Sequence, residues 1–266
     1  MSNTDEESEM TKTATALAFV LSLGAGDAFG QSFTGNLGSD DVRAVSPALE
    51  AYAGEALAKR LWSRPGLSKR DRSIVTLTVA IARNQSAILP EQLALALDNG
   101  VKPSEISEMI THLAFYSGWG NAMAATAAAK DVFAARGVAA SALPPAKPEL
   151  LPIDQVAEAA RAATVEKLIG TATPGLVKDT TEVLFQDLWL RPGLAPRDRS
   201  LVTVSALIAN GQTAQITPHL NRALDNGLTA GEAGEVVSHL AYYAGWPNAF
   251  SAASIVKDVI AKRTAK

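Results

Sequence analysis

The chain has 266 residues, 47% of them hydrophobic, which is enough apolar material for one or two globular cores. Its net charge of −3 and the lack of a lysine- or arginine-rich run argue against a nucleic-acid partner. It has no cysteine and three histidines, which excludes thiol catalysis and disulfides and argues against a histidine-rich metal centre.

The first 45 residues are predicted to form an N-terminal tail with a signal peptide. A polar, acidic opening is followed by an apolar run over residues 14–23 and by the small-residue pattern Ala28-Phe29-Gly30. This resembles a secretory signal over about residues 10–30, so the mature chain is predicted to begin near Gln31 and to be periplasmic or secreted. The apolar run is too short for a permanent membrane anchor.

Two features favour the alternative, a cytoplasmic protein whose tail is disordered or forms a first amphipathic helix. Acidic residues precede Met10, and Asp27 lies close to the proposed cleavage point. In either case residues 31–45 are rich in Gly, Ser and Asp and indicate a linker.

Apolar residues at helical spacing predict a first set of helices after this tail. The helices are expected over residues 46–62, from Ser68 through about Ile81, and over 88–98, 103–116 and 119–136. Ser68 and Asp71 resemble a capping box, and Gly100 and Gly118 are placed to end helices. No stretch alternates with period two for long enough to form a strand, so the fold is predicted to be all-α.

A proline-rich linker over residues 138–152 separates this set from a second one. The four prolines between residues 137 and 152 forbid a continuous helix there. The second set of helices is expected over residues 153–169, 175–189, 195–210, 216–226, 229–244 and 246–263.

The second set repeats the first. The run LWSRPGLSKRDRS at residues 61–73 recurs as LWLRPGLAPRDRS at 188–200, and 38 of the 76 positions over 61–136 are identical 127 residues later. The chain is therefore a tandem duplication, with one copy over 46–137 and the other over 153–266.

The copies differ at one chemically important place. His219 and Arg222 lie three residues apart on one helical face, where the first copy has Gln92 and Leu95. An imidazole beside a cation can hold and protonate a carboxylate-bearing ligand, which points to the second copy as the catalytic one. The alternative is that His219 is a surface histidine on a short helix.

Other polar residues are preserved in both copies and have structural explanations. His112 and His239 are expected to donate to a backbone carbonyl inside the bundle. Arg70 and Arg197 are expected to be solvated. Arg72 and Arg199 are expected to pair with nearby acids or, alternatively, to face a ligand.

Three motifs of the second copy carry a resemblance to a known family. They are W-x-R-P-G-L-x-x-R-D-R-S-L-V-T, H-L-x-x-A-L-D-N-G and E-x-x-E-V-V-x-H-L-A-Y-Y-A-G-W-P-N-A. The pattern resembles the carboxymuconolactone decarboxylase family of the AhpD-like superfamily, and it covers both copies. The resemblance implies an all-α helical unit that assembles into rings, commonly hexamers. A two-copy chain would accordingly form a homotrimer that imitates a hexamer.

The family reaction implies roles for several residues. Loss of carbon dioxide from a carboxylated lactone requires an anion site, a donor to a developing oxyanion and a proton for carbon. Arg199 or Arg222 would bind the anion, His219 would deliver the proton, and Gln212 or Tyr243 would supply the oxyanion donor. Trp246 completes the candidate substrate-binding set, although its spacing also fits a core or interface aromatic. The scheme requires no metal and no organic cofactor.

The thiol-peroxidase branch of the superfamily is excluded. The resemblance places its Cys-x-x-Cys pair at Gln212 and Gln215 in the second copy and at Gln85 and Ile88 in the first. None of these side chains forms the thiolate that attacks a peroxide.

Two functional hypotheses remain. The first is a cofactor-free lyase that acts on a small carboxylated lactone or related cyclic acid. The second is a non-catalytic helical scaffold or small-molecule-binding ring that has lost the family chemistry. Export by a signal peptide would favour a substrate other than the intracellular family lactone.

Overall fold

The computed structural model describes residues 39–265, which form helices and no strand. The first part comprises α3 (Ser39–Val45), α4 (Pro47–Tyr52), the π-helical η1 (Ala53–Leu61), α5 (Lys69–Ala82), α6 (Leu89–Asp98), α7 (Pro103–Ser117), α8 (Trp119–Ala135) and η2 (Ala140–Ala142). The second comprises α9 (Gln155–Ile169), α10 (Pro174–Asp179), η3 (Thr180–Phe185), η4 (Leu188–Leu190), α11 (Pro196–Ala209), α12 (Thr213–Asp225), α13 (Ala230–Ala244) and α14 (Trp246–Thr264). The prediction of an all-α tandem duplication is confirmed.

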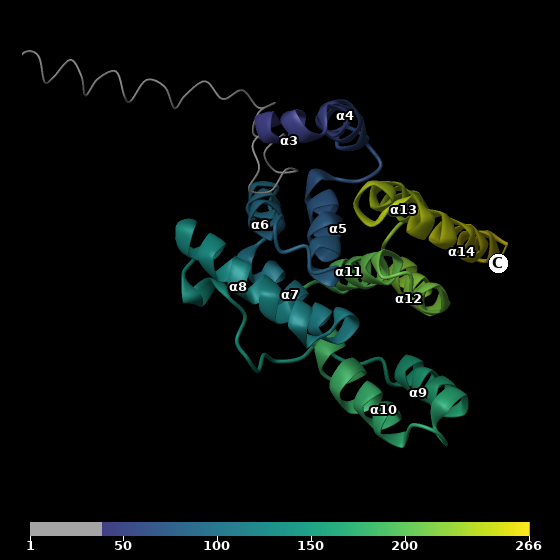
Figure 1. The fold of residues 1–266 in the computed structure, drawn as a ribbon. Helices are drawn as coiled ribbons and strands as arrows, with labels where there is room; N and C mark the ends of the chain where they lie inside the picture. The colour runs from purple at the N-terminus through teal and green to yellow at the C-terminus, as the bar shows by residue number, and fades with distance from the viewer. Residues whose placement is uncertain (1–38, 266) are drawn as a thin grey trace, which may run out of the picture.

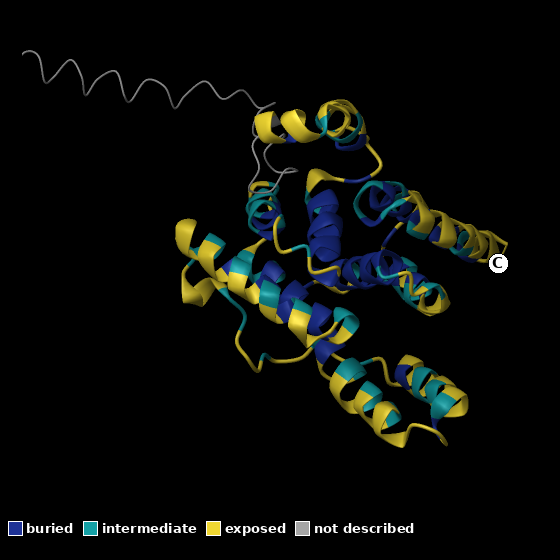
Figure 2. Cartoon of the chain, in the orientation of Figure 1, coloured by how far each residue is buried: buried dark blue, intermediate teal, exposed yellow. Residues whose placement is uncertain are grey.

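The helices of the two copies pack together in one bundle. Helices α5 and α11 pack side by side at the centre of the molecule and are almost completely buried (Figures 1 and 2). Helix α13 of the second copy packs on α5 of the first, and α7 of the first packs on α11 of the second. The helix pair α9 and α10 lies at one end of this bundle (Figure 1). Each central helix is therefore covered by a helix of the other copy.

The helix boundaries agree with the sequence pattern except in four places. Residues 39–45 were predicted as linker and form α3, whose first turn carries Asp40 and Asp41 beside the positive end of the helix dipole. The predicted helices over 46–62 and 175–189 both change to π-helical turns, and the second then breaks before η4. Helix α12 begins at Thr213, three residues before the predicted start at 216. It contains Pro218, which has no backbone N–H and therefore removes one backbone donor from the helix.

Local signals were accurate where a side chain or glycine sets a helix end. The Ser68 hydroxyl accepts a hydrogen bond from the backbone N–H of Asp71 and caps α5, as predicted. Gly118 has a φ of 96° between α7 and α8, a backbone conformation that other residues rarely adopt. The predicted signal peptide and its cleavage point lie outside the described residues. None of the helices within 39–265 is both long and apolar enough to span a bilayer.

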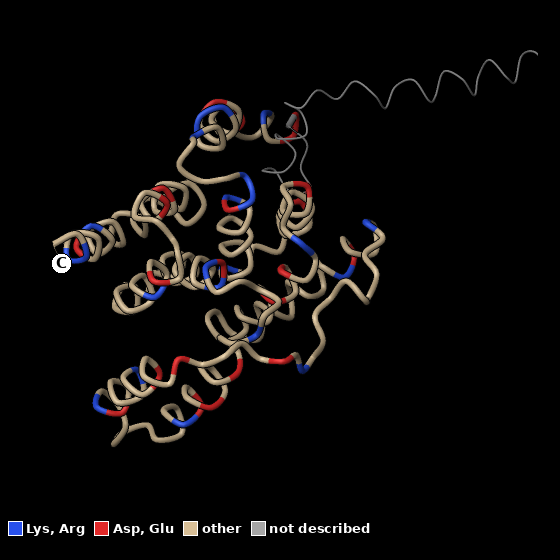
Figure 3. The backbone as a smooth tube through the Cα atoms, turned by 180° about the vertical axis from the view of Figure 1, so that it is seen from behind, with Lys and Arg blue, Asp and Glu red and all other residues tan. Residues whose placement is uncertain are grey.

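Charged residues at the starts of α5 and α11 hold the two copies together. Blue and red segments adjoin in the first turns of both helices in Figure 3. Arg70 reaches Asp198 at 2.8 Å, and Arg197 reaches Asp71 at 2.7 Å, so each arginine pairs with the carboxylate of the other copy. The prediction that Arg70 and Arg197 are solvated was wrong, because the central packing of α5 on α11 brings these turns together.

Candidate functional site

A buried hydrogen-bond network occurs twice, each time with parts from both copies. Arg199 of α11 donates to Glu108 of α7 at 3.0 Å and to the backbone carbonyl of Arg191 at 2.8 Å. Its other terminal nitrogen lies 3.3 Å from Nδ1 of His112, whose Nε2 lies 2.7 Å from the Thr203 hydroxyl. The same contacts recur around α5 and α13, 127 residues away, between Arg72, Glu235, Arg64, His239 and Thr76.

The partners of His112 determine where its proton lies. An arginine can only donate, so Nδ1 of His112 accepts from Arg199 and the ring proton is on Nε2. The Thr203 hydroxyl donates to the backbone carbonyl of Arg199 and therefore accepts from that Nε2. Burial, with Arg199 and His219 as further causes, lowers the pKa of His112 well below its usual value. His112 is a neutral structural residue, but its acceptor is a threonine hydroxyl rather than the predicted backbone carbonyl.

An aromatic cluster adjoins the network around Arg199 and His112, and we call the two together the second site; the network around Arg72 and His239 and its surroundings are the first site. The Trp189 indole N–H donates to the Tyr116 hydroxyl at 2.9 Å, and the His219 ring stacks on Trp189 with centroids 6.0 Å apart. Phe185 stacks on the Trp189 ring at 5.7 Å, and the guanidinium of Arg222 lies 4.8 and 4.9 Å from the centroids of Phe185 and Trp189. The cluster combines η3, η4 and α12 of the second copy with α7 of the first.

Three polar groups of the cluster have unused hydrogen-bonding capacity. Among the described residues, the Arg222 guanidinium has no carboxylate or hydrogen-bond partner and His219 makes only ring contacts. The Tyr116 hydroxyl accepts from Trp189, and no described residue accepts its proton. All three residues are partly exposed. By contrast, the arginines of the twin networks all pair with carboxylates: Arg64, Arg72, Arg191 and Arg199.

The surroundings shift the pKa values of these groups in ways that decide their charge. Burial, and then the positive charge of Arg222, lowers the pKa of His219 to about 4, so its ring is neutral at pH 7. Burial raises the pKa of Tyr116 above its usual value, so the hydroxyl keeps its proton. Burial also lowers the pKa of Arg222, which shows that this cation sits where charge is costly. An anion beside Arg222 would relieve that cost.

The first site lacks the histidine and the arginine of this cluster. The positions equivalent to His219, Arg222 and Phe185 hold Gln92, Leu95 and Ala58. The buried histidine, tryptophan and tyrosine persist, because Trp62 donates to Tyr243 at 2.8 Å and His239 stacks on Tyr243 at 4.8 Å. The duplicated network is thus a shared framework, and the half-buried cation and second imidazole occur only at the second site.

The structure brings together some of the predicted site residues and separates others. His219 and Arg222 are adjacent, as predicted. Arg199 lies beneath them, but it is fully buried and its charge is offset by Glu108, so it is not available to bind an anion. Gln212 is exposed at the N-cap of α12, two turns before His219. Tyr243 belongs to the first site.

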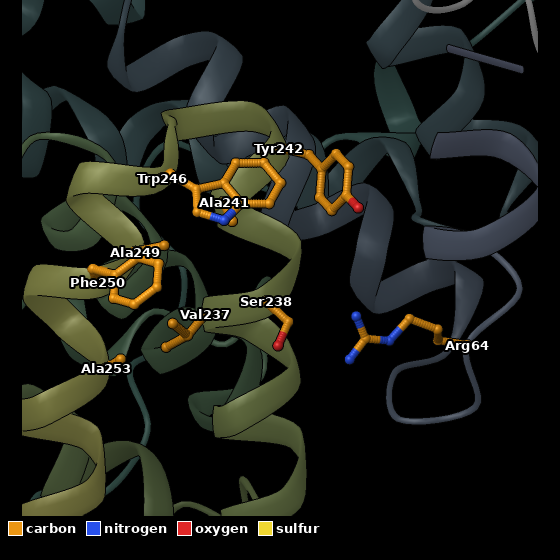
Figure 4. A pocket seen from close by; sticks show the side chains of 9 residues that line it. All are labelled: Arg64, Val237, Ser238, Ala241, Tyr242, Trp246, Ala249, Phe250 and Ala253. Carbon is orange, nitrogen blue, oxygen red and sulfur yellow. The ribbon is translucent and has the colours of Figure 1, made fainter. Parts of the chain in front are cut away.

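Trp246 lies in a separate groove. It is 50% exposed and lines an open pocket of about 300 Å³ between α13 and α14, together with Tyr242 and Phe250 (Figure 4). Arg64 faces the groove from the loop after η1. Trp246 is not a core aromatic. Its ring packs against that of Tyr242, with centroids 4.8 Å apart, and makes no ring contact with the His219 cluster in the described part of the chain.

Sequence reasoning missed Tyr116, Phe185 and Trp189. Tyr116 and Tyr243 are equivalent in the two copies, so the sequence alone could not show that α7 of the first copy faces α12 of the second. The available signal was the duplication itself: Trp189 and Tyr116 recur as Trp62 and Tyr243 with one offset.

Comparison with known proteins agrees with this architecture. A 73-residue region is 37% identical to the 4-carboxymuconolactone decarboxylase of Acinetobacter baylyi, covering 27% of this chain and 54% of that protein. An 80-residue region is 34% identical to the nitrosuccinic acid decarboxylase npaB of Metarhizium robertsii, covering 30% of this chain and 56% of that protein. The chain thus spans about half the length of the curated relatives it matches. The model of the carboxymuconolactone decarboxylase family matches residues 47–131 and 174–258, more than half of the sequence, so the chain belongs to the carboxymuconolactone decarboxylase family.

Proposed function

We propose that this protein is a cofactor-free decarboxylase that acts on a small carboxylated lactone or a related acid at its second site. The observation that carries the proposal is Arg222, a half-buried guanidinium without a carboxylate partner among the described residues, which lies beside His219 and Tyr116. The names of the two similar proteins, both decarboxylases of carboxylic acids, support the same reaction class.

The reaction moves negative charge from a carboxylate to a carbonyl oxygen. The carbon–carbon bond to the carboxylate breaks, its electron pair flows into a conjugated carbonyl, carbon dioxide leaves, and a proton then adds to carbon. The Tyr116 hydroxyl stabilises this change by facing the oxygen on which charge develops, whereas Arg222 binds an anionic group of the substrate. The leaving carboxylate faces the apolar rings of Phe185 and Trp189, where losing its charge is favourable.

His219 returns the proton in this scheme, although it is neutral in the free protein. With a pKa of about 4, about one molecule in a thousand carries the imidazolium at pH 7. A bound anion offsets the charge of Arg222 and thereby raises the pKa of His219. If His219 is the acid, kcat/KM should fall as the pH rises above about 4. A flat profile between pH 5 and 8 would reject this role.

The test uses variants that copy the first site. His219→Gln should lower turnover of 4-carboxymuconolactone or nitrosuccinic acid by about 10²–10⁴-fold, the usual contribution of a positioned acid or base. Arg222→Leu should mainly raise KM, because its role is to bind an anion.

A matched pair of tyrosines supplies the control. Tyr116→Phe should lower kcat, whereas Tyr243→Phe, the same change at the equivalent position of the first site, should leave it close to the unaltered value. Full activity of His219→Gln would overturn the assignment. If the unaltered protein released no carbon dioxide from either acid, the alternative of a non-catalytic binding ring would replace the proposal.

A further inference from the structure

The proline-rich linker between the two copies lies against helices α7 and α8 of the first copy. Leu143, whose backbone is extended, lines a cavity of about 460 Å³ together with residues of both helices. Further along the linker, Arg191 receives two backbone carbonyls: it donates to that of Pro145 at 3.3 Å and to that of Ala146 at 3.0 Å. A guanidinium beside this helix pair thus holds an irregular, proline-rich segment by its backbone.

The equivalent face of the second copy has no such cover in the described part of the chain. Arg64 is the counterpart of Arg191, and α13 and α14 are the counterparts of α7 and α8. The side chain of Arg64 is 42% exposed, against 13% for Arg191, and among residues 39–265 it pairs with Glu235 alone. Arg64 and residues of α13 and α14 line the pocket of about 300 Å³ that contains Trp246, which we call the Trp246 groove. The donors that hold the linker in the first copy therefore have open counterparts here.

Aromatic rings and unused donors line the rest of the Trp246 groove. Tyr242, Trp246 and Phe250 lie on its α13–α14 side, and the guanidinium of Arg64 points into it from the loop after η1 (Figure 4). Trp246 and Phe250 are 50% and 71% exposed. The Tyr242 hydroxyl and the Trp246 indole N–H make no hydrogen bond with any described residue, so each can donate to a carbonyl oxygen. Aromatic-lined grooves are the surfaces on which extended proline-rich segments dock.

We propose that the Trp246 groove binds an extended proline-rich segment of a partner polypeptide, much as the α7–α8 face holds the linker. The backbone carbonyls of the segment accept from Arg64, and its proline rings pack on Trp246 and Phe250. Because proline fixes φ near the value of an extended chain, such a segment loses little conformational entropy when it binds. The groove is separate from the His219 cluster, so the proposal does not depend on the decarboxylase activity.

A fluorescent peptide with the linker sequence of residues 140–151, ASALPPAKPELL, tests the proposal. Its anisotropy should rise when the full-length protein is added. A second peptide with alanine in place of the three prolines should bind about 10-fold more weakly, because each proline restricts the free peptide. Arg64→Met should weaken binding of the proline peptide by about 10–100-fold, the usual worth of hydrogen bonds to a charged group, while Glu235 keeps its pairing with Arg72. Trp246→Ala should weaken it as well.

The duplication supplies a matched control. Trp119 is the counterpart of Trp246 and is 66% exposed, but it belongs to the copy whose face the linker already contacts, so Trp119→Ala should leave the Kd unchanged. Absence of binding, equal binding of the two peptides, or an unchanged Kd in both Arg64→Met and Trp246→Ala would overturn the proposal. Light scattering tests a second copy of the chain as the occupant. If Trp246→Ala lowers the mass of the assembly and the unaltered protein binds no peptide, the groove is a contact between copies and the proposal is wrong.

Discussion

The twin networks allow one buried ion cluster to be compared with its own duplicate. Glu108 is 1% exposed and accepts hydrogen bonds from Arg191 and from Arg199, whose side chain is fully buried. Glu108→Gln keeps the shape of the side chain but removes the one carboxylate within residues 39–265 that pairs with Arg199. An uncompensated buried charge of this kind usually costs about 3–5 kcal/mol of unfolding free energy.

The equivalent change in the first site should cost less. Glu235 is 9% exposed, and one of its two partners, Arg64, is 42% exposed. Water can therefore solvate Arg64 when Glu235→Gln removes the negative charge, and only Arg72 remains buried without a counter-charge. We expect a loss of about 1–3 kcal/mol for Glu235→Gln, because partial exposure lowers the value of an ion pair.

Urea unfolding at pH 7 and constant protein concentration measures both losses. For a protein of this size about 1 kcal/mol corresponds to a Tm change of 2–4 °C, so Glu108→Gln should lower the Tm by roughly 6–20 °C. The order of the two variants is the decisive result. A larger loss for Glu235→Gln, or a loss below about 1 kcal/mol for Glu108→Gln, would refute the argument that burial sets the strength of these clusters.

Three further predictions concern charge, assembly and processing. Replacing Arg222 with Leu should raise the pKa of His219 from about 4, but to less than 6.5 because burial is the larger cause; NMR titration of the ring that shows no change would contradict this. The chain should form a homotrimer, with light scattering at about three times 27.8 kDa, and a strict monomer at micromolar concentration would contradict it. Mass spectrometry of protein from its native host should find an N-terminus near Gln31, whereas full-length protein in the cytosol would reject the signal peptide.

The fold could be predicted from the sequence because its signals are local and occur twice. Apolar spacing, the Ser68 cap and the positive-φ glycines placed most helices to within a few residues. The π-helical turns were missed because they retain helical spacing and differ only in their hydrogen bonds, such as that from the backbone N–H of Gln186 to the carbonyl of Thr181 at 3.0 Å. These turns precede Trp62 and Trp189, so the missed detail lies next to the sites.

Part of the site could be predicted, because some of its residues are close in sequence whereas others come together only by long-range packing. His219 and Arg222 lie on one helix, and their difference from Gln92 and Leu95 is visible in the alignment of the copies. Tyr116 could not be chosen over its equivalent Tyr243, because that choice depends on which copy supplies each helix. Only tertiary packing contains this information.

The exchange of helices changes what the duplication can mean for catalysis. The asymmetry between the copies first suggested that the second copy alone carries the activity. The second site, however, takes Tyr116, His112 and Glu108 from α7 of the first copy, so neither copy holds a complete site. A duplicated chain of this kind can specialise one site by changing α12 and η3, because α6 and η1 hold the equivalent positions of the other site. The residues of the buried networks must then be kept in both copies, because each site takes part of its network from the first copy and part from the second.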